Sequence, residues 1–407
     1  MRRWLEGLEQ FAIDVILERR YGRRAELLRW ILLIFSGVYC FIVQCRLKLY
    51  RDRYFHQRAL GCPVISVGNL TVGGTGKTPV VEMLARELLK GGRKVAILTR
   101  GYKSVAKPLT SRIIDKIFRN KGVFLPRIVS DGQSLLLDSR RAGDEPFMLA
   151  NNLKGVPVLV DKDRAKSGLF AIQHFGADTL LLDDGLQYLR LQHRIDIVLI
   201  DCQSPFGNEY LLPRGTLREP CHNLQRANYI FITKSTTTGN AALIERIRTY
   251  NKTAEIIECA HRSKYLRNIV TGEIHPLEFL QGKTIASICG IAVPESFENA
   301  LRHLGAEIEI AKSYTDHHRF SNKEIENFIR RCGRRNIPAI LTTEKDAVRF
   351  PRIIEPEVPI YFLRVEIEIL SGHTSWERLL TQVCNPDALL KSPAHDRCFL
   401  PGRLISA

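Results

Sequence analysis

The sequence predicts an α/β fold in which a mostly parallel sheet is joined to a second, smaller α/β domain and preceded by an N-terminal membrane-associating helix. Three observations predict it. Apolar runs of strand length alternate with helix-like segments, a glycine-rich loop follows the first run, and one long apolar stretch precedes them all. Buried strands joined by helical crossovers are typical of parallel sheets covered on both faces.

Length and charge limit the kind of protein. The 407 residues suffice for two domains, and 45% hydrophobic with 25% charged residues is a globular composition. The formal net charge of +17 predicts an anionic partner, and Lys and Arg outnumber Asp and Glu by 12 to 6 in residues 1–60 and by 8 to 1 in residues 100–127. These windows show no nucleic-acid-binding motif and no interleaved aromatic residues, so we expect no nucleic acid partner. No obligate protein partner is evident.

Residues 1–60 form a basic and apolar arm that we expect to associate with an anionic membrane surface. The stretch 27–43 is apolar except for Arg29, Ser36 and Gly37, and arginines lie on both sides of it. A spanning helix needs about 20 apolar residues and usually carries its positive charge on one side. The pattern therefore favours an interfacial helix over a spanning helix, and either of these over a plain buried helix.

Apolar runs after the arm predict two groups of strands. The first domain, residues 61–235, contains the runs 63–68, 94–99, 156–160, 179–183, 195–201 and 228–233. The smaller α/β domain, residues 284–385, contains the runs 284–290, 306–310, 338–343 and 359–365. We interpret 236–283 as a linker region, 386–407 as a tail, and 103–127 as a basic surface insertion with one amphipathic helix.

The first apolar run leads into the glycine-rich loop GNLTVGGTGKTP, residues 68–79. Thr71 stands where the usual phosphate-binding pattern has its first glycine, but the order of strand, loop and helix is the one that supports such a motif. Glycines let backbone N–H groups surround phosphate oxygens, and the helix N-terminus adds partial positive charge. The loop therefore predicts a P-loop NTPase-like domain, in which Lys77 reaches the β- and γ-phosphates and Thr78 holds Mg²⁺. The expected nucleotide-binding residues are Gly73, Gly74, Thr75, Gly76, Lys77 and Thr78.

The metal requires an acidic ligand, and two strand ends offer one. Asp183 and Asp184 end one apolar run, and Asp201 ends another. Two adjacent carboxylates make the richer Mg²⁺ site, so we favour the Asp183–Asp184 pair over Asp201. ATP is the expected cofactor, because the sequence TKST at 233–236 lacks the aspartate that guanine recognition requires.

Two further polar clusters are ambiguous from their residues alone. Asp144 and Glu145 precede an apolar stretch, so they fit a helix cap as well as a functional site. His317, in the sequence DHH at 316–318, fits either a solvated loop or a site.

The ten cysteines contain no C-x-x-C pair, which argues against a zinc site. No signal peptide with a cleavage site is evident, and several cysteines lie in apolar runs. We therefore expect reduced, buried thiols in a cytoplasmic protein.

The ordered set of motifs resembles a known family. VGNLTVGGTGKTP, TRGY, AGDEP, DDGLQ, FGNEYLLPRGTLREP, CGIAVPESF, TDHHRFS and LTTEKDAVR are similar to motifs of the tetraacyldisaccharide 4′-kinase (lipid A 4′-kinase) family. The resemblance implies transfer of the ATP γ-phosphate, with Mg²⁺, to the 4′-hydroxyl of a tetraacylated glucosamine disaccharide 1-phosphate lipid. It also implies a peripheral or monotopic protein at the cytoplasmic face of the bacterial inner membrane. The alternative is a P-loop ATPase switch of the partitioning or maturation type, without a lipid acceptor.

The resemblance also implies roles for individual residues. Asp144 matches the general base, His317 matches a histidine that assists it from the second domain, and Lys77 matches the phosphate ligand. The implied metal-site residues are Thr78, Asp183, Asp184 and Glu145. The implied further polar active-site residues are Arg100, Arg164, Gln187, Arg218 and Glu219.

Overall fold

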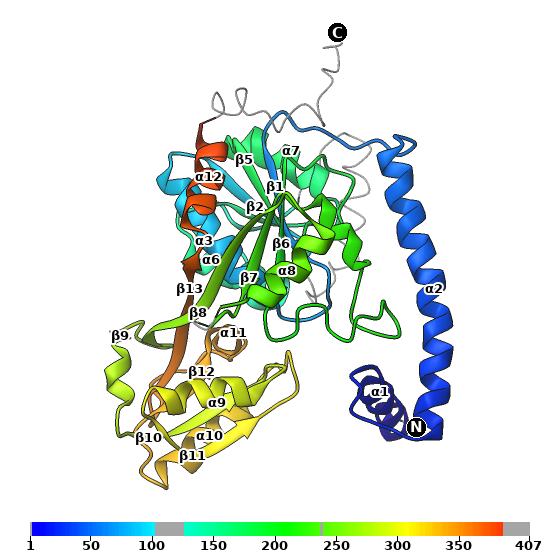
Figure 1. The fold of residues 1–407 in the computed structure, drawn as a ribbon. Coiled ribbons are helices and arrows are strands. Elements are labelled where there is room, and N and C mark those ends of the chain that lie inside the picture. Colours follow the sequence, from blue (N-terminus) through cyan, green and yellow to red (C-terminus); the bar gives the residue numbers. More distant parts are fainter. Residues whose placement is uncertain (1, 102–125, 237–238, 386–407) are drawn as a thin grey trace.

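The computed structural model describes residues 2–101, 126–236 and 239–385. The helix expected within 103–127 lies outside the described residues apart from positions 126 and 127, and the tail 386–407 lies wholly outside them. The described chain forms two lobes and an N-terminal arm that runs alongside them (Figure 1).

Within the described residues, one 13-stranded sheet runs through both lobes in the order β11-β10-β12-β13-β8-β7-β6-β1-β5-β2-β4-β3, with β9 paired to β8. The first lobe, here called the P-loop lobe, contains β1 (Val64–Asn69), β2 (Val95–Thr99), β3 (Arg127–Ser130), β4 (Val158–Val160), β5 (Thr179–Asp183), β6 (Ile195–Asp201) and β7 (Tyr229–Thr233). The second lobe contains β9 (Ile274–His275), β10 (Thr284–Cys289), β11 (Glu307–Ser313) and β12 (Ile340–Thr343). Two long strands, β8 (Glu255–Asn268) and β13 (Ile360–Ser371), join the lobes.

The predicted parallel arrangement is confirmed for the central strands. β1 lies between β5 and β6 and is parallel to both, and β10 is parallel to β11 and β12. The pairs β3–β4 and β8–β13 are antiparallel. Each apolar run predicted as a strand overlaps one of these strands. β1, β2, β5 and β7 are buried along their whole length, as expected for apolar runs in a sheet covered on both faces, whereas β11 is mostly exposed and alternates apolar with polar residues.

The range 236–283, interpreted from the sequence as a linker region, contains regular structure. It holds α8 (Ala241–Tyr250), β8, β9 and the short 3₁₀ helix η2 (Leu277–Leu280). β8 carries charged residues such as Glu258 and Arg262, and its buried side chains alternate with more exposed ones over much of its length. No continuous apolar run therefore marks this strand in the sequence.

Helices cover both faces of the P-loop lobe (Figure 1). On one face, α3 (Lys77–Lys90) buries Val80, Val81, Leu84 and Leu88 completely, as their helical spacing predicts. α6 (Asp144–Asn152) and α12 (His373–Cys384) share this core, while α7 (Arg164–Phe175) and α8 pack against the opposite face. The shorter helices of this lobe are α5 (Ser139–Ala142) and η1 (Cys221–Arg226). In the second lobe, α9 (Pro294–His303) and α10 (Asn322–Gly333) cover the two faces, and α11 (Glu344–Ala347) follows β12.

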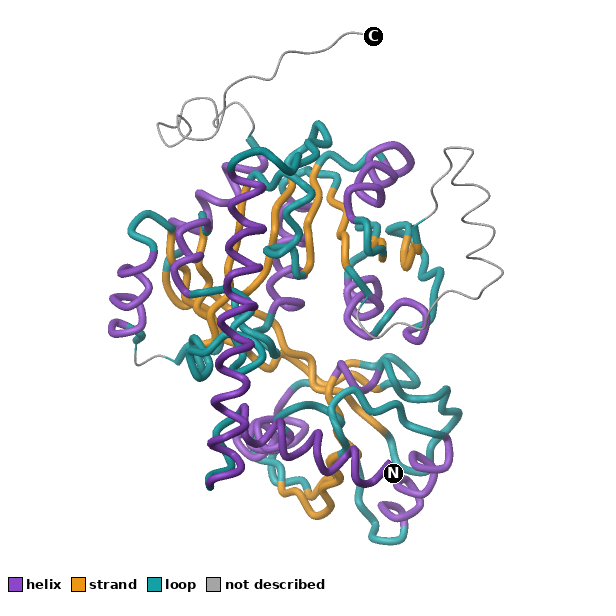
Figure 2. Tube along the Cα trace, turned by 90° about the vertical axis from the view of Figure 1, so that its right-hand side faces the viewer, coloured by secondary structure: helices purple, strands orange, loops and turns teal. Residues whose placement is uncertain are grey.

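The arm consists of α1 (Arg2–Ile16) and α2 (Arg23–Arg51), and α2 runs along the outside of the P-loop lobe (Figures 1 and 2). By length and composition alone α2 could cross a membrane, since its most apolar window has a mean hydropathy of 1.9. Its 29 residues extend about 43 Å at the rise of an α-helix. The helix therefore continues beyond the apolar stretch 27–43 on both sides. Only 6% of that window is buried, so α2 is not the plain buried helix that the sequence left open.

A buried charged cluster joins the lobes beside the C-terminal end of α6. Arg364 of β13 donates to Glu344 Oε2 at 2.8 Å and to Glu82 of α3. Asn152, the last residue of α6, donates to Glu344 Oε1 at 2.7 Å and to Glu82 Oε2 at 3.2 Å. Because buried charges are costly unless they are paired, the members of the cluster hold one another in place. The cluster therefore fixes this end of α6 against α3 and the second lobe.

Candidate active site

The glycine-rich loop connects β1 to α3 at the carboxyl edge of the sheet. Gly73 and Gly74 are exposed, and Gly73 has a φ of +129°, a conformation that favours glycine. Thr75 is buried, and its carbonyl oxygen accepts a hydrogen bond of 2.9 Å from Thr233 Oγ1, at the end of β7. The loop is therefore open to solvent at its glycines and anchored where it meets the sheet.

A histidine supports the loop where α3 begins. Gly76 precedes the helix in the left-handed conformation, with a φ of +81°, and a Cβ there would lie 2.7 Å from two atoms of the His261 ring. Burial, together with the charge of Lys234, lowers the pKa of His261 to about 4. The neutral ring of His261, on β8, thus fills the space that a Cβ would need, so only glycine fits at position 76.

Three of the predicted site residues, Asp184, Gln187 and Arg218, lie near Lys77. Its Nζ lies 3.2 Å from Asn69 Oδ1 and 3.7 Å from Asp184 Oδ1. Arg218 donates from Nη1 to both oxygens of Asp184 at 2.9 Å, and Gln187 donates to the Asn69 carbonyl at 3.1 Å. Burial favours the neutral form of Asp184, but the charges of Lys77 and Arg218 outweigh it and hold the pKa of Asp184 below its usual range. The end of α3 that meets the loop thus faces an ionised carboxylate held by two cations.

Asp183, at the end of β5, has the properties of a cation ligand. Its Oδ2 accepts from Thr99 Oγ1 at 3.3 Å, whereas its buried Oδ1 has no hydrogen-bond partner within the described residues. Burial, and then the charges of Glu145 and Asp184, raise the pKa of Asp183 well above its usual range. A cation would reverse this effect, and Mg²⁺ typically takes only one or two protein carboxylates beside water and phosphate oxygens. The Asp183–Asp184 pair and the buried Thr78 therefore fit Mg²⁺.

Glu145 lies near this pair without joining it. Its Oε1 is 3.4 Å from Lys345 Nζ. In the part of the chain that the structure describes, no three His, Cys, Asp or Glu side chains form a group that could hold a metal ion by themselves. The nine described cysteines are free thiols.

Asp144 and His317, which lie far apart in the sequence, meet across the two lobes. Nδ1 of His317 is 3.2 Å from Asp144 Oδ2, and Asp144 is buried at the first position of α6. Arg319 donates to Asp144 Oδ1 at 3.0 Å, and Arg349 donates from Nε to Oδ2 at 2.8 Å. Burial tends to raise the pKa of Asp144, but the hydrogen bond from His317 and the charges of Arg349 and Arg319 lower it below its usual range. Asp144 is therefore a carboxylate at neutral pH.

Arg164 and Arg100 lie at two neighbouring loops. Arg164 is buried at the start of α7, with its guanidinium 4.8 Å from the centre of the Tyr188 ring. Burial lowers the pKa of Arg164, and the charges of Asp184 and Asp183 oppose this effect without cancelling it. Arg100 directly follows β2 and is exposed.

Two of the acids considered from the sequence are engaged elsewhere. Glu219 is buried and accepts hydrogen bonds from Asn223 at 2.8 Å and from Arg226 at 2.6 Å, both in η1. Asp201, the alternative metal ligand, forms an ion pair with Lys234. In this structure Asp184 is the acid beside Lys77.

Three residues of this region were not predicted as site residues: Asn69, Arg319 and Arg349. All three stand inside motifs that carry the resemblance, GNLT, TDHHRFS and LTTEKDAVR. Those motifs were the available signal, because no spacing rule brings an arginine of the second lobe to a helix of the first.

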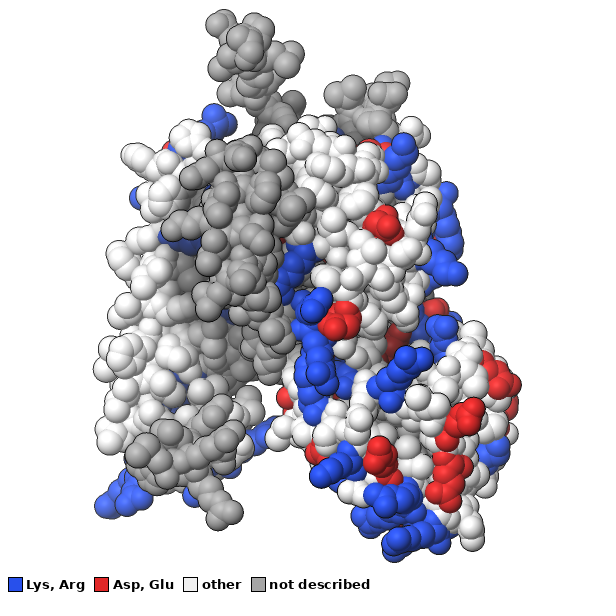
Figure 3. Space-filling view, turned by 180° about the vertical axis from the view of Figure 1, so that it is seen from behind, with Lys and Arg blue, Asp and Glu red and all other residues white. Residues whose placement is uncertain are grey.

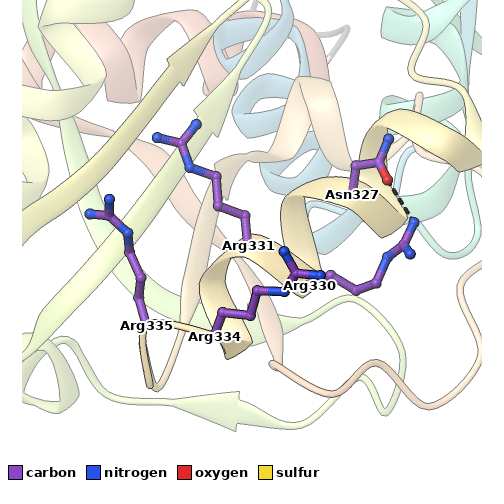
Figure 4. Close-up of a pocket in the computed structure, with 5 residues that line it drawn as sticks. All are labelled: Asn327, Arg330, Arg331, Arg334 and Arg335. Carbon is purple, nitrogen blue, oxygen red and sulfur yellow. Dashed lines mark hydrogen bonds between the residues drawn. The ribbon is translucent and has the colours of Figure 1, made fainter.

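A separate group of arginines lies at the C-terminal end of α10 (Figure 4). Arg330, Arg331, Arg334 and Arg335, with Asn327, line a surface hollow of about 300 Å³. Among the described residues no acidic side chain pairs with Arg331 or Arg334, and Lys and Arg gather on this lobe in Figure 3. None of the predicted site residues lines the hollow. Its arginines lie outside residues 1–60 and 100–127, so part of the positive charge lies outside these two basic windows.

The strand, glycine loop and helix, with Lys77 beside an acidic strand end, define a P-loop NTPase-like protein. The family model described as tetraacyldisaccharide-1-P 4′-kinase matches residues 28–385. The chain belongs to the tetraacyldisaccharide-1-P 4′-kinase family.

Individual relatives agree with this assignment. The chain is 37% identical over 360 residues to a tetraacyldisaccharide 4′-kinase of Syntrophus aciditrophicus, covering 86% of this chain and 91% of the relative. It is 35% identical over 351 residues to one of Geobacter sulfurreducens, covering 86% and 92%. Among solved structures, an "apo" form LpxK from Aquifex aeolicus in complex with ATP matches with a TM-score of 0.68 and 28% identity, covering 88% of this chain and 99% of that one.

The function follows from the family. The chain is a kinase of lipid A biosynthesis that phosphorylates the 4′-hydroxyl of a tetraacylated disaccharide 1-phosphate. The partitioning-type ATPase switch, the alternative kept open from the sequence, is therefore wrong.

Proposed function

We propose that this kinase works on the surface of an anionic membrane, at the cytoplasmic face of the bacterial inner membrane, with Asp144 as the base that accepts the proton of the sugar hydroxyl. The observation that carries the catalytic part is the pairing of Asp144 with His317 at the start of α6, a helix that packs in the same core as α3. Burial raises the pKa of Asp183 most, and the charge of Glu145, the residue after Asp144, helps to raise it, which supports a position of the start of α6 near the proposed metal ligands.

The nucleotide end of the site uses charge and backbone geometry. Lys77 neutralises the phosphates of ATP, and Gly73 to Gly76 supply backbone N–H donors. Thr78, Asp183 and Asp184 would hold Mg²⁺, which when bound would supply neutralisation of the negative charge on the transferred group. Arg218 keeps Asp184 ionised and oriented by donating to both of its oxygens.

The acceptor end uses the carboxylate of Asp144. Phosphoryl transfer depends mainly on positioning and charge neutralisation, so a carboxylate that accepts a hydrogen bond from the hydroxyl and then its proton is sufficient as the base. His317 occupies Oδ2 of Asp144 and fixes the direction in which the carboxylate points.

The membrane part rests on the two faces of α2. Its outer face is an exposed apolar stripe at helical spacing, made of Leu27, Trp30, Ile31, Ile34, Phe35, Val38, Phe41 and Ile42. In Figure 3 this flank carries few charged side chains above its lower end. Such a stripe beside arginines is typical of a helix that lies in the membrane interface.

The inner face of α2 supports an interfacial position over a spanning one. Ser36 Oγ donates to the Leu211 carbonyl at 2.7 Å, and Tyr39 donates to the Arg218 carbonyl at 3.0 Å. Arg214, whose backbone N–H donates to Ser36 Oγ, belongs to the same segment. Crossing a bilayer with these contacts intact would carry arginines into hydrocarbon, which is costly.

Phosphate transfer itself provides the direct test of the function. We expect the purified protein to move labelled γ-phosphate from MgATP to the tetraacylated disaccharide 1-phosphate, because the site has both a phosphate end and an acceptor end. ATP turnover should depend on that lipid. ATP hydrolysis that proceeds equally without the lipid acceptor would contradict the assignment.

Membrane docking gives a second prediction. Replacing Trp30 and Phe41 together by serine should weaken binding to vesicles that contain anionic lipid, because both side chains are about two thirds exposed on the outer stripe (66% and 70%). High salt should release part of the wild-type protein, since each nearby Lys or Arg contributes about 1 kcal/mol that salt screens. Vesicle sedimentation measures both effects.

The matched control is Ile354→Ser, which removes an equally exposed apolar side chain (75%) from the second lobe. It should bind vesicles as the wild type does. Labelling in sealed vesicles decides between the interfacial and spanning positions: if a cysteine placed before Leu27 reacts from the far side, α2 crosses the bilayer and the proposal is wrong.

A further inference from the structure

Arg349 forms the centre of a buried network between the lobes. Its side chain has no exposed surface, and three of its nitrogens make contacts. Nε donates to Asp144 Oδ2 at 2.8 Å, and Nη2 lies 3.1 Å from Nδ1 of His317. Nη1 donates to the Gly290 carbonyl at 2.9 Å and to Asp346 Oδ1 at 3.0 Å. One guanidinium thus touches both members of the Asp144–His317 pair.

The second lobe holds Arg349 rigidly. Asp346, which is fully buried in α11, accepts from the backbone N–H of Gly290 at 3.1 Å and from Thr343 Oγ1 at 2.6 Å. The Gly290 carbonyl also accepts from the backbone N–H of His317 at 3.1 Å. Arg349, Asp346 and the backbone of His317 therefore all form hydrogen bonds with Gly290, in the loop after β10.

α6 is held by the second lobe at both ends. Asp144, its first residue, contacts Arg349, and Asn152, its last residue, contacts Glu344. Glu344, Lys345 and Asp346 are consecutive residues of α11, and Lys345 lies 3.4 Å from Glu145. A single short helix and the turn after it thus contact both ends of α6, whose apolar side chains pack in the core of the P-loop lobe beside α3.

We propose that Arg349 is a positioning residue for phosphoryl transfer: it fixes Asp144 and His317 relative to each other across the lobes and touches neither ATP nor the lipid. The inference rests on the proposed role of Asp144 as the base. It differs from a purely structural role, because a buried ion pair that only stabilised the fold would change the amount of folded protein and not the rate of each folded molecule.

Arg349→Lys tests the inference with the positive charge beside Asp346 retained. A lysine has one nitrogen and cannot reach Asp144, His317 and Gly290 together, so we expect kcat to fall by about 10- to 100-fold, the loss typical of small misplacements of a reacting group. KM for ATP should stay unchanged, because the hydrogen-bond partners of the Arg349 side chain are Asp144, His317, Gly290 and Asp346, and none of these belongs to the phosphate loop. Rates are expressed per folded molecule after thermal unfolding has measured the folded fraction.

Two controls make the result specific. Arg93→Lys changes another largely buried arginine, which donates to Thr179 Oγ1 at 2.9 Å and to the Asp178 carbonyl at 3.0 Å away from the site, and should leave kcat unchanged. In an Asp144→Asn background, Arg349→Lys should cause no further loss, because Arg349 acts through that carboxylate.

The outcomes separate this inference from the proposed function. Full activity of Asp144→Asn alone would remove the proposed base. An impaired Asp144→Asn variant combined with a normal kcat in Arg349→Lys, or with losses that multiply in the double variant, would leave the base in place and overturn the positioning role.

Discussion

Lys77→Ala should lower kcat by about 10²- to 10³-fold while the fold stays intact. The lysine is a pre-organised cation directed at the reacting phosphates, and losing one such contact costs several kcal/mol of barrier. Its removal should not unfold the protein, because Asp184 keeps both hydrogen bonds from Arg218 and α3 keeps its buried apolar face. Steady-state transfer to the lipid acceptor, with circular dichroism of the variant, measures both parts of this prediction.

The control for this variant lies on the same helix. Lys90 pairs with Glu87 at 2.7 Å on the surface, and exposed pairs of this kind contribute at most about 1 kcal/mol. Lys90→Ala should therefore transfer phosphate at the wild-type rate. A near-normal kcat in Lys77→Ala would remove the phosphate-loop assignment, whatever the resemblance to other kinases.

The parts of the fold that the sequence predicts are those whose signal is local. β1, the glycine loop and the buried face of α3 follow one another within residues 64–90, so each supports the interpretation of the next. β8 illustrates the opposite case, because it is a long strand with charged side chains that is stabilised by pairing with β13 from far along the chain. Its His261, which closes the space beside Gly76, could not be assigned from the sequence for the same reason.

The site residues also differ in whether their signal in the sequence is local. Lys77 and Thr78 are fixed by the loop, and the Asp183–Asp184 pair by the end of a buried strand, so sequence reasoning reaches them. Asp144 and His317 are ambiguous in isolation, since each also fits a helix cap or a loop, and the resemblance alone implied their roles. Arg349 has no local signal, because its function depends on contacts between two lobes. The network around it is a property of the assembled fold.

Asp144 and His317 should behave as one unit in kinetics. Asp144→Asn keeps the shape of the side chain but removes the proton acceptor, so we expect kcat to fall by about 10²- to 10⁴-fold, the range for a general base. His317 has a φ of +65°, and asparagine tolerates such a conformation better than most residues, so His317→Asn removes the ring with little backbone strain. It should cause a smaller loss, because Arg349 and Arg319 still hold the carboxylate.

The double variant decides whether the two residues are coupled. If His317 acts only by orienting Asp144, the double variant should be little slower than Asp144→Asn, because groups that act together lose their effect together. The neighbouring His318 is the matched control: it lies 3.2 Å from Glu324 and stacks on Tyr314, so His318→Asn should leave kcat unchanged. Losses that multiply in the double variant would mean that His317 acts independently of Asp144, and an unaffected His317→Asn would return His317 to the role of a loop residue. A double-mutant cycle of Asp144→Asn and His317→Asn, measured with saturating ATP and lipid, tests this coupling. Under these conditions kcat reports the transfer step or a later step, and not substrate binding.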